Sequence, residues 1–456
     1  MQQQFLEKMK KVSRAQWILL GLIAVGIFLR TYHFSQLLVF ASDQARDFGI
    51  VKNVLSGNSS WPLLGADMTG GRGFRLGPIY YYFQLLSALL FGVSAVSQAY
   101  PDLLFAILSI PLLYYFLKRY FSENTTLALT AVYVFSYFSI EYARFAWNVN
   151  LIPFFVLLLL ISLNEFLVGE EKTAWKWIVG AGVALGVGIQ LHAILLLLFP
   201  TLAFCGFVFL LRRNRKVWKK IVAIILLALV LNLPQFVSEQ QTGFANTKTF
   251  FGAFFFKSQR SGGTVFRGLI LDVACNAQAN THILSSLGNK NICNFLYSIQ
   301  ETSTTYNTKI KLEKDPLSLF GKFVSLLFSA LGLWLLARNF FKDDLRRKYF
   351  SGLVLFYSAL YFLIMIPIAP GSRLRYFLPI IFLPFVFLGL FFEFWVKKYP
   401  KNYAWLVGAV LVFLLAANLN SMWLKLKDSS CTKETQASFG CNLPLDGAGA
   451  KIRVRK

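Results

Sequence analysis

Residues 40–47 read Phe-Ala-Ser-Asp-Gln-Ala-Arg-Asp, and they follow directly on the first hydrophobic segment of the chain. The protein is poor in acid, with 21 Asp plus Glu against 46 Lys plus Arg. Two of these carboxylates, Asp43 and Asp47, nevertheless stand four residues apart at this point. Residues four apart on a helix share one face, so both carboxylates can reach the same volume. We therefore expect a helix here that presents a pair of carboxylates.

The composition predicts an integral membrane protein. Apolar residues make up 56% of the 456 residues and charged residues only 15%. The windows 151–163, 221–233 and 376–392 contain no charged residue, and a membrane-spanning helix needs about 20 apolar residues. No small-residue cleavage site follows the basic start, so we expect an uncleaved first span. The net charge of +25 falls mostly in short loops, which favours the positive-inside rule over nucleic-acid binding.

Basic clusters predict the orientation of the chain. They are the N-terminus, 118–119, 172–176, 212–220, 338–348 and 397–401. Placing all of them in the cytoplasm predicts an all-α polytopic membrane protein with about eleven transmembrane helices, its N-terminus inside and its C-terminus outside. The expected spans are 17–36, 97–117, 125–141, 150–168, 175–191, 193–211, 221–237, 317–337, 349–369, 376–396 and 403–423.

The same arrangement divides the chain into four parts. They are a transmembrane module 1–237 with a first outer loop 37–96, a long extracytoplasmic loop 238–316, C-terminal transmembrane helices 317–423 and an outer tail 424–456. Within the first loop, the tyrosine-rich segment 77–92 is short for a crossing, so we expect an interfacial helix. Every unusual polar cluster then lies on the outer face, which predicts a site at the outer membrane surface.

The first of these clusters is the acidic segment itself. We take Asp43 as the candidate general base, with Asp47 and Arg46 as supporting residues. Charged side chains beside hydrocarbon are costly unless they have a function. The alternative is structural, because Ser42 or Asp43 would also serve as the cap of a helix that runs to Leu55.

The second cluster lies between two expected spans, from Glu141 to Asn150. An indole ring stacks on sugars and amides bind hydroxyl groups, so Arg144, Trp147, Asn148 and Asn150 are candidate sugar or acceptor contacts. Glu141 is a further candidate supporting carboxylate. The alternative is a structural role, in which the two asparagines only cap the next helix.

Three further residues are candidate sugar or acceptor contacts. Gln190 and His192 end a glycine-rich span, and Tyr80 belongs to the expected interfacial helix. A lone histidine near a helix end is more often structural than catalytic.

Four arginines are candidate ligands of a lipid phosphate. Arg373 and Arg375 lie at the outer end of a span with no acid close in sequence, which suits an anionic headgroup. Arg72 and Arg75 stand among glycines and could hold a phosphate in the same way. The alternative for the second pair is a snorkelling anchor of the interfacial helix.

Four of the five cysteines fall in the segments expected outside. Their close spacing in pairs suggests the bridges Cys275–Cys293 and Cys431–Cys441 in an oxidising compartment. Four unrelated free thiols are the alternative.

Taken in order, these motifs resemble the GT-C superfamily of integral-membrane glycosyltransferases. The likeness covers roughly residues 15–395 and points to the branch of protein O-mannosyltransferases, the lipid A aminoarabinose transferase and related bacterial family-39 enzymes. The matching motifs are Asp43-Gln44 with Ala45-Arg46-Asp47, Gly77-Pro78-Ile79-Tyr80, Ala143-Arg144-Phe145 and Arg375-Tyr376-Phe377-Leu378-Pro379. Two positions depart from the pattern, because Gln44 stands where the family has Glu and Asn148 where many relatives have Asp.

The resemblance implies an inverting glycosyltransferase of cell-envelope synthesis. It would move a hexosyl or pentosyl group from a polyprenyl phosphate donor to a hydroxyl of an extracytoplasmic lipid, glycan or protein. It also implies a bacterial or archaeal cytoplasmic membrane, with the active site outside. Partners would then be the donor, membrane lipids and the acceptor, with no nucleic acid.

No P-loop, H-E-x-x-H or C-x-x-C motif occurs, and the chain has three histidines. Together with Gln44 and Asn148 this argues against a metal-dependent mechanism, so we expect no cofactor and leave a divalent ion open. A lipid-linked oligosaccharide polymerase or ligase is the nearest alternative function. A lipid or solute transporter is less favoured, because such proteins show internal repeats and polar groups near the membrane midplane.

Overall fold

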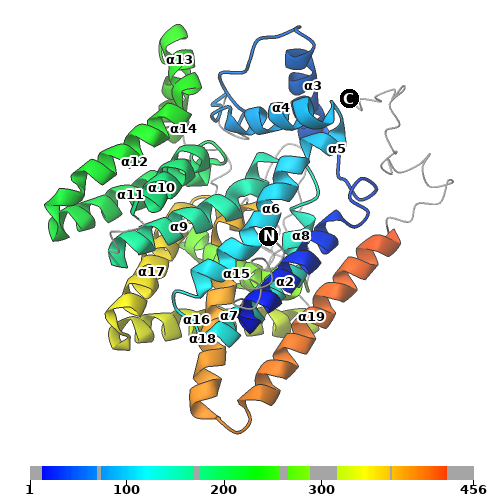
Figure 1. Ribbon diagram of the computed structural model, residues 1–456, viewed down its shortest axis with the longest axis vertical. Coiled ribbons are helices and arrows are strands. Elements are labelled where there is room, and N and C mark those ends of the chain that lie inside the picture. The colour runs from blue at the N-terminus through cyan, green and yellow to red at the C-terminus, as the bar shows by residue number, and fades with distance from the viewer. Residues whose placement is uncertain are drawn as a thin grey trace, which may run out of the picture.

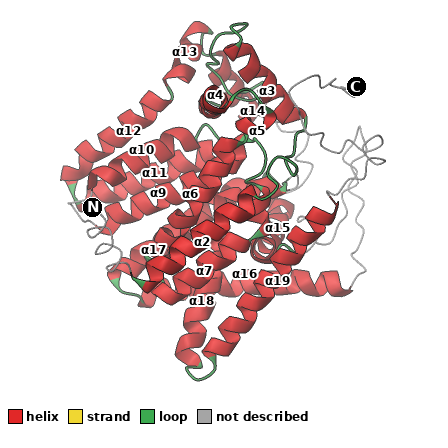
Figure 2. Cartoon of the chain, turned by 45° about the vertical axis from the view of Figure 1, so that its right-hand side comes forward, coloured by secondary structure: helices red, strands yellow, loops and turns green. Residues whose placement is uncertain are grey.

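The computed structural model describes residues 13–68, 73–168, 174–255, 265–287, 316–369 and 372–428. These residues form a bundle of helices with short connections (Figures 1 and 2). Within the described ranges, β-structure is limited to one bridge between Asp67 and Arg75. The prediction of an all-α polytopic membrane protein is therefore confirmed.

The first span is helix α2 (Arg14–Thr31), which starts at a capping box between Ser13 and Gln16. Arg30, near its end, is fully buried and donates to the carbonyls of Gly26 and Val134 and to the Ser139 hydroxyl. A buried guanidinium is tolerated only with such partners. The arginine thereby fixes α2 against helices α7 (Glu123–Phe135) and α8 (Tyr137–Glu141).

Helix α9 (Ile152–Val168) forms the centre of the bundle. It packs against α6 (Tyr100–Leu117), α10 (Ala174–Gly188) and α17 (Leu345–Met365). Aliphatic and aromatic side chains fill this core. The remaining long helices are α11 (Ala193–Arg213), α12 (Trp218–Leu231), α16 (Pro316–Lys342), α18 (Leu383–Lys398) and α19 (Tyr403–Asp428).

Large apolar side chains also cover the outside of α2, α12, α16 and α19. A helix that is apolar on all sides belongs in a core or a membrane. Within the part of the chain that the structure describes, seven helices are long and apolar enough to cross a membrane, or up to nine if each of two bent pairs is one span. The chain is thus an integral membrane protein. All eleven predicted spans coincide with helical segments, although α7 and α10 are only 13 and 15 residues long and the count of eleven stays a prediction.

Three helices in or next to the predicted first outer loop gather at one end of the bundle (Figure 1). They are α3 (Ser42–Leu55), α4 (Ile79–Phe91) and α5 (Ala95–Gln98). Helix α4 begins after Pro78, ends at Gly92 with a φ of 82°, and packs on α3 and α5. The turn between α18 and α19, which carries one of the basic clusters, lies at the opposite end (Figure 1). This separation agrees with the predicted sidedness, which stays a prediction.

The predicted outer loop 238–316 contains helices where it is described. They are the end of α13 (Leu233–Gln241), all of α14 (Ala245–Phe255) and all of α15 (Val265–Ser285). Helix α15 packs between α16, α18 and α19. It buries Asp272, Asn276 and Asn280, which stand four residues apart on one face. Those polar residues lower the mean hydropathy of the segment, so a search of the sequence for apolar windows does not find this helix.

Candidate active site

The acidic segment forms the first turns of α3. Asp43 has a side chain that is 47% exposed, and its carboxylate accepts a bond of 3.2 Å from Arg46 Nη1. Gln44 supplies the cap, because its Oε1 accepts the N–H of Ala41 at 3.1 Å. Its Nε2 donates to the carbonyl of Ala146 at 2.9 Å. Since the amide of Gln44 caps the helix, neither Ser42 nor Asp43 does so, and the Asp43 carboxylate is left to face Arg46.

Asp47 is the buried member of the pair, with a side chain only 2% exposed. Its Oδ1 receives Arg46 Nη2 at 2.8 Å and the hydroxyl of Tyr81 at 3.0 Å. Burial raises the pKa of the Asp47 carboxyl, against the opposing effect of Arg46 and Tyr81. Arg46 therefore bridges an open carboxylate and a buried one, and Tyr81 links the buried one to α4.

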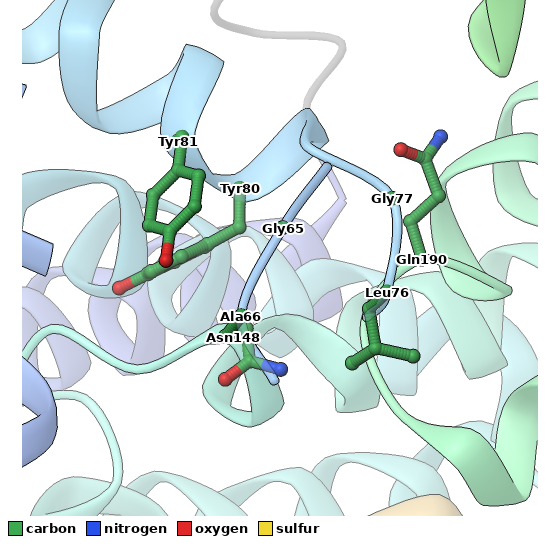
Figure 3. A pocket seen from close by; sticks show the side chains of 8 residues that line it. All are labelled: Gly65, Ala66, Leu76, Gly77, Tyr80, Tyr81, Asn148 and Gln190. Atoms are coloured by element: carbon green, nitrogen blue, oxygen red, sulfur yellow. The ribbon is translucent and has the colours of Figure 1, made fainter. Parts of the chain in front are cut away.

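A small cavity opens beside Tyr81, whose hydroxyl binds Asp47 (Figure 3). The rings of Tyr80 and Tyr81 lie on one side of it, and Asn148 and Gln190 on the others. Gln190 Oε1 accepts the N–H of Ile79 at 3.2 Å, which ties the start of α4 to the end of α10. Its lining residues are Gly65, Ala66, Leu76, Gly77, Tyr80, Tyr81, Asn148 and Gln190.

Asn148 and Asn150 hold the short helix η1 (Asn148–Leu151) in place. Asn148 Nδ2 donates to the carbonyl of Leu191 at 2.5 Å. Asn150 Nδ2 donates to the carbonyl of Phe145 at 2.7 Å. Both amides thus bind backbone groups, and only Asn148 also lines the cavity.

Asp102, at the start of α6, was not singled out from the sequence. It is fully buried, and its Oδ2 accepts the hydroxyl of Tyr80 at 2.9 Å. Its Oδ1 accepts the backbone N–H of Trp147 at 3.0 Å. The signal was present as a carboxylate directly after Pro101 at the head of an apolar helix.

Trp147 links this network to the predicted phosphate site. The guanidinium of Arg375, in helix η5 (Leu374–Ile380), lies 5.0 Å from the centre of the Trp147 ring. Arg375 also lies 5.3 Å from the centre of the Tyr376 ring. Arg373 directly precedes the same helix, in the N-cap position. The structure therefore places Arg375 against the turn that leads to Asn148.

His192 is the N-cap of α11, and its Nδ1 accepts the N–H of Ile194 at 3.2 Å. Its ring also contacts Tyr376, at 5.3 Å between centroids. Burial and the neighbouring Arg375 lower the pKa of His192 to about 3. The ring is therefore neutral at physiological pH. Its contacts give it a structural role, as the N-cap of α11 and as a packing partner of Tyr376.

Arg75 braces the hairpin that approaches the cavity. Its Nε donates to the carbonyl of Gly65 at 3.0 Å and lies 3.1 Å from Asp67. Asn246 of α14 pairs with the backbone of Arg75 through bonds of 2.8 and 3.0 Å. Asn246 was not predicted either. Arg72 lies outside the described residues.

Two predicted site residues lie elsewhere. Arg144 is buried and donates from Nη2 to the carbonyl of Leu29 at 2.7 Å. Arg144 and Glu141 line a second small cavity, together with residues of α19 such as Lys425. The first half of the turn thus lines the second cavity, whereas Asn148, at its end, lines the first. We therefore assign neither Glu141 nor Arg144 a role beside Asp43.

Cys275 lies buried in α15, whereas Cys293, Cys431 and Cys441 fall outside the described residues. Both disulfide pairings accordingly stay predictions. In the described ranges, no group of three or more His, Cys, Asp or Glu side chains could hold a metal ion. The need for a divalent ion remains a question for experiment.

Comparisons with known proteins bear on the fold. A family model described as dolichyl-phosphate-mannose-protein mannosyltransferase matches residues 76–237. No curated protein sequence matches the chain.

Among solved structures, the chain is similar to ArnT from Cupriavidus metallidurans bound to undecaprenyl phosphate. The identity is 15%, the TM-score is 0.54, and the match covers 91% of this chain and 73% of that one. It is also similar to the oligosaccharyltransferase AglB from Archaeoglobus fulgidus in complex with an inhibitory peptide and a dolichol-phosphate. There the identity is 12%, the TM-score is 0.52, and the coverage is 93% and 57%. The chain thus has the fold of the GT-C superfamily of membrane glycosyltransferases, as its sequence motifs predict.

Proposed function

We propose that the protein is an inverting glycosyltransferase that moves a sugar from a polyprenyl phosphate donor to a hydroxyl group of an acceptor outside the membrane. The observation that carries this proposal is the network of contacts that joins α3, α4, the turn before η1 and η5 beside one small cavity. Asp43, Tyr81, Asn148 and Arg375 come from four separate parts of the chain. They meet through the contacts of Arg46, Asp47, Asp102 and Trp147. The likeness in fold to ArnT and AglB supports the same chemistry.

Asp43 would serve as the general base. The acceptor oxygen attacks the anomeric carbon, its proton passes to the Asp43 carboxylate, and the bond from the sugar to the phosphate oxygen breaks. The electron pair leaves with the polyprenyl phosphate, so the sugar configuration inverts in one displacement. Asp43 suits this role better than Asp47, because Asp43 is half exposed whereas Asp47 is buried under Arg46 and Tyr81. General-base catalysis contributes about 10²–10⁴-fold.

Arg375 would hold the phosphate, with Arg373 beside it on η5. A phosphate leaving group needs electrostatic stabilisation more than it needs a strong acid, and a preorganised cation supplies it. The indole of Trp147 fixes the guanidinium from one face, which limits its reorganisation. Asn148 and Tyr80, which line the cavity, are the candidate sugar contacts.

The chain would lie in a bacterial or archaeal cytoplasmic membrane with this site outside. The sugar, the acceptor and the prenyl length are left open by this proposal. The decisive experiment incubates membranes that contain the protein with a panel of radiolabelled polyprenyl phosphate sugars and follows which label leaves the donor. Transfer that requires Asp43 supports the proposal, and no transfer from any donor of the panel contradicts it.

A further inference from the structure

Asp102 is a buried acidic side chain that the chemistry described above does not use. It lies at the head of α6, where both carboxylate oxygens accept hydrogen bonds from different segments. Within the described residues it has no ion-pair partner. A buried carboxyl group is costly unless its oxygens are hydrogen-bonded, so the two bonds identify the groups that this side chain holds.

The two bonds go to two walls of the candidate site. Tyr80 is a lining residue of the first cavity, and its hydroxyl donates to Oδ2. The other bond comes from the backbone N–H of Trp147, the residue whose ring faces Arg375. One carboxylate thus fixes the start of α4 and the turn before η1 relative to each other.

The N–H of Trp147 has a specific need for this partner. Trp147 is extended, with φ −156° and ψ 130°, and it precedes η1 as its N-cap residue. A backbone N–H that is buried without an acceptor costs free energy comparable to a lost hydrogen bond. If the acceptor is lost, the turn must shift to find another, and the indole shifts with it.

We infer that Asp102 is a positioning residue for donor binding, which holds the Trp147 indole where it can fix Arg375 against the lipid phosphate. Asp102 does not touch the donor; it acts through the Trp147 backbone. The inference rests on the proposed function, because it takes Arg375 as the phosphate ligand.

Two substitutions at Asp102 distinguish loss of the acidic group from loss of the hydrogen-bond acceptor. In Asp102→Asn, the amide oxygen can still accept from Trp147, and the amide N–H₂ can donate to the Tyr80 hydroxyl, which then accepts. In Asp102→Leu, no acceptor remains for the N–H of Trp147. We expect the asparagine variant to retain donor affinity and the leucine variant to lose it.

The experiment measures binding of undecaprenyl phosphate to the purified full-length protein in detergent micelles. Asp102→Leu should weaken binding roughly ten-fold, the size of one desolvated cation–π contact. Tyr80→Phe removes only the other hydrogen bond and should change affinity by less than Asp102→Leu. Adding Asp102→Leu to Trp147→Ala should cause little further loss, because residues that act through one contact are not additive.

A matched control guards against a general loss of stability. Asn418 of α19 is also buried, and its Oδ1 accepts a turn N–H, that of Tyr137, at 2.8 Å. Asn418→Leu should lower the unfolding temperature and leave the affinity for undecaprenyl phosphate unchanged. Should Asp102→Leu fail to fold, Asp102→Ala replaces it in the same cycle.

The outcomes distinguish this inference from the proposed function. Absence of binding by the wild type, or binding that Arg375→Ala leaves intact, contradicts the phosphate role of Arg375. Binding that depends on Arg375 but is unchanged by Asp102→Leu, or that falls additively with Trp147→Ala, overturns the role of Asp102 alone.

Discussion

Two cavities among the described residues each have an arginine and a carboxylate close by, and the two arginines bind different partners. The first is lined by Tyr81, which binds Asp47, and the second is lined by Glu141 and Arg144. At the first, the arginine binds two carboxylates, and a tyrosine from another helix joins them. At the second, Arg144 donates to a backbone carbonyl of α2. An arginine near a carboxylate in sequence therefore marks a site only where the tertiary contacts turn the charges toward each other.

The largest expected effect falls on Asp43, the half-exposed carboxylate that Arg46 links to Asp47. Asp43→Asn should reduce sugar transfer by about 10²–10⁴-fold, because the amide cannot accept the acceptor proton. The measurement is label transfer from the polyprenyl phosphate donor. Glu141→Gln, at the second cavity, is the matched control and should stay active. Equal losses of sugar transfer in the two variants would contradict the different roles that we assign to the two cavities.

A smaller loss is expected when the wall of the first cavity is moved. A Cβ added at Gly77 would lie 2.2 Å from Gln190 Oε1, so Gly77→Ala must displace the side chain that holds the start of α4. We expect the free energy of unfolding to fall by about 1–3 kcal/mol. We also expect a drop in sugar transfer that is larger than the loss of folded protein explains. Gly49→Ala, where a Cβ meets nothing within 4 Å, is the control and should leave transfer intact. Comparable transfer in both variants would show that the Gln190 contact is dispensable.

Arg144, at the second cavity, provides the opposite test, in which stability and not lipid binding should change. Arg144→Leu leaves the carbonyl of Leu29 without its donor, which costs about 1–3 kcal/mol of unfolding free energy. Because its contacts are structural, affinity for undecaprenyl phosphate should not change. Arg375→Ala should show the reverse pattern, with weaker binding and a nearly unchanged unfolding temperature. Thermal unfolding and lipid binding on both variants provide the check, and matching profiles would argue against separate roles.

The smallest effect concerns the buried carboxylate. The pKa of Asp47 is raised from its ordinary value of 3.8 in the folded state. Between these two pKa values the folded protein binds more protons than the unfolded chain, so the stability from this group falls as pH rises. Asp47→Asn should flatten that slope when unfolding temperatures are compared across mildly acidic pH. A steeper slope in the variant would refute the raised pKa.

Much of the fold could be predicted because each signal was local. Apolar windows and basic clusters placed helices at all eleven expected spans, and Pro78 with Gly92 bounded the interfacial helix. Helix α15 escaped this reasoning because Asp272, Asn276 and Asn280 lower its hydropathy. Their burial depends on α16, α18 and α19, which follow later in the chain.

The candidate site likewise contains residues that could be predicted from the sequence and residues that could not. Asp43, Asp47 and Arg375 were predictable from residue type and sequence position, because charges are costly at a membrane boundary. Asp102 and Asn246 were not, since each looks like an isolated polar residue until its partner from a distant segment is known. Tyr81 was missed for the same reason, as its hydroxyl finds Asp47 only when α4 lies on α3.

The sequence by itself determined that this chain is a helical membrane protein with its acidic segment at the end of the first span. Hydrophobicity and charge act on each segment separately, so they can be read along the chain. Only the tertiary structure decided that Gln44 caps α3, that Arg144 faces away from Asp43, and that Asp102 joins Tyr80 to Trp147. Hydrogen bonds are short and directional, and which atoms meet at 3 Å is set by how the helices pack.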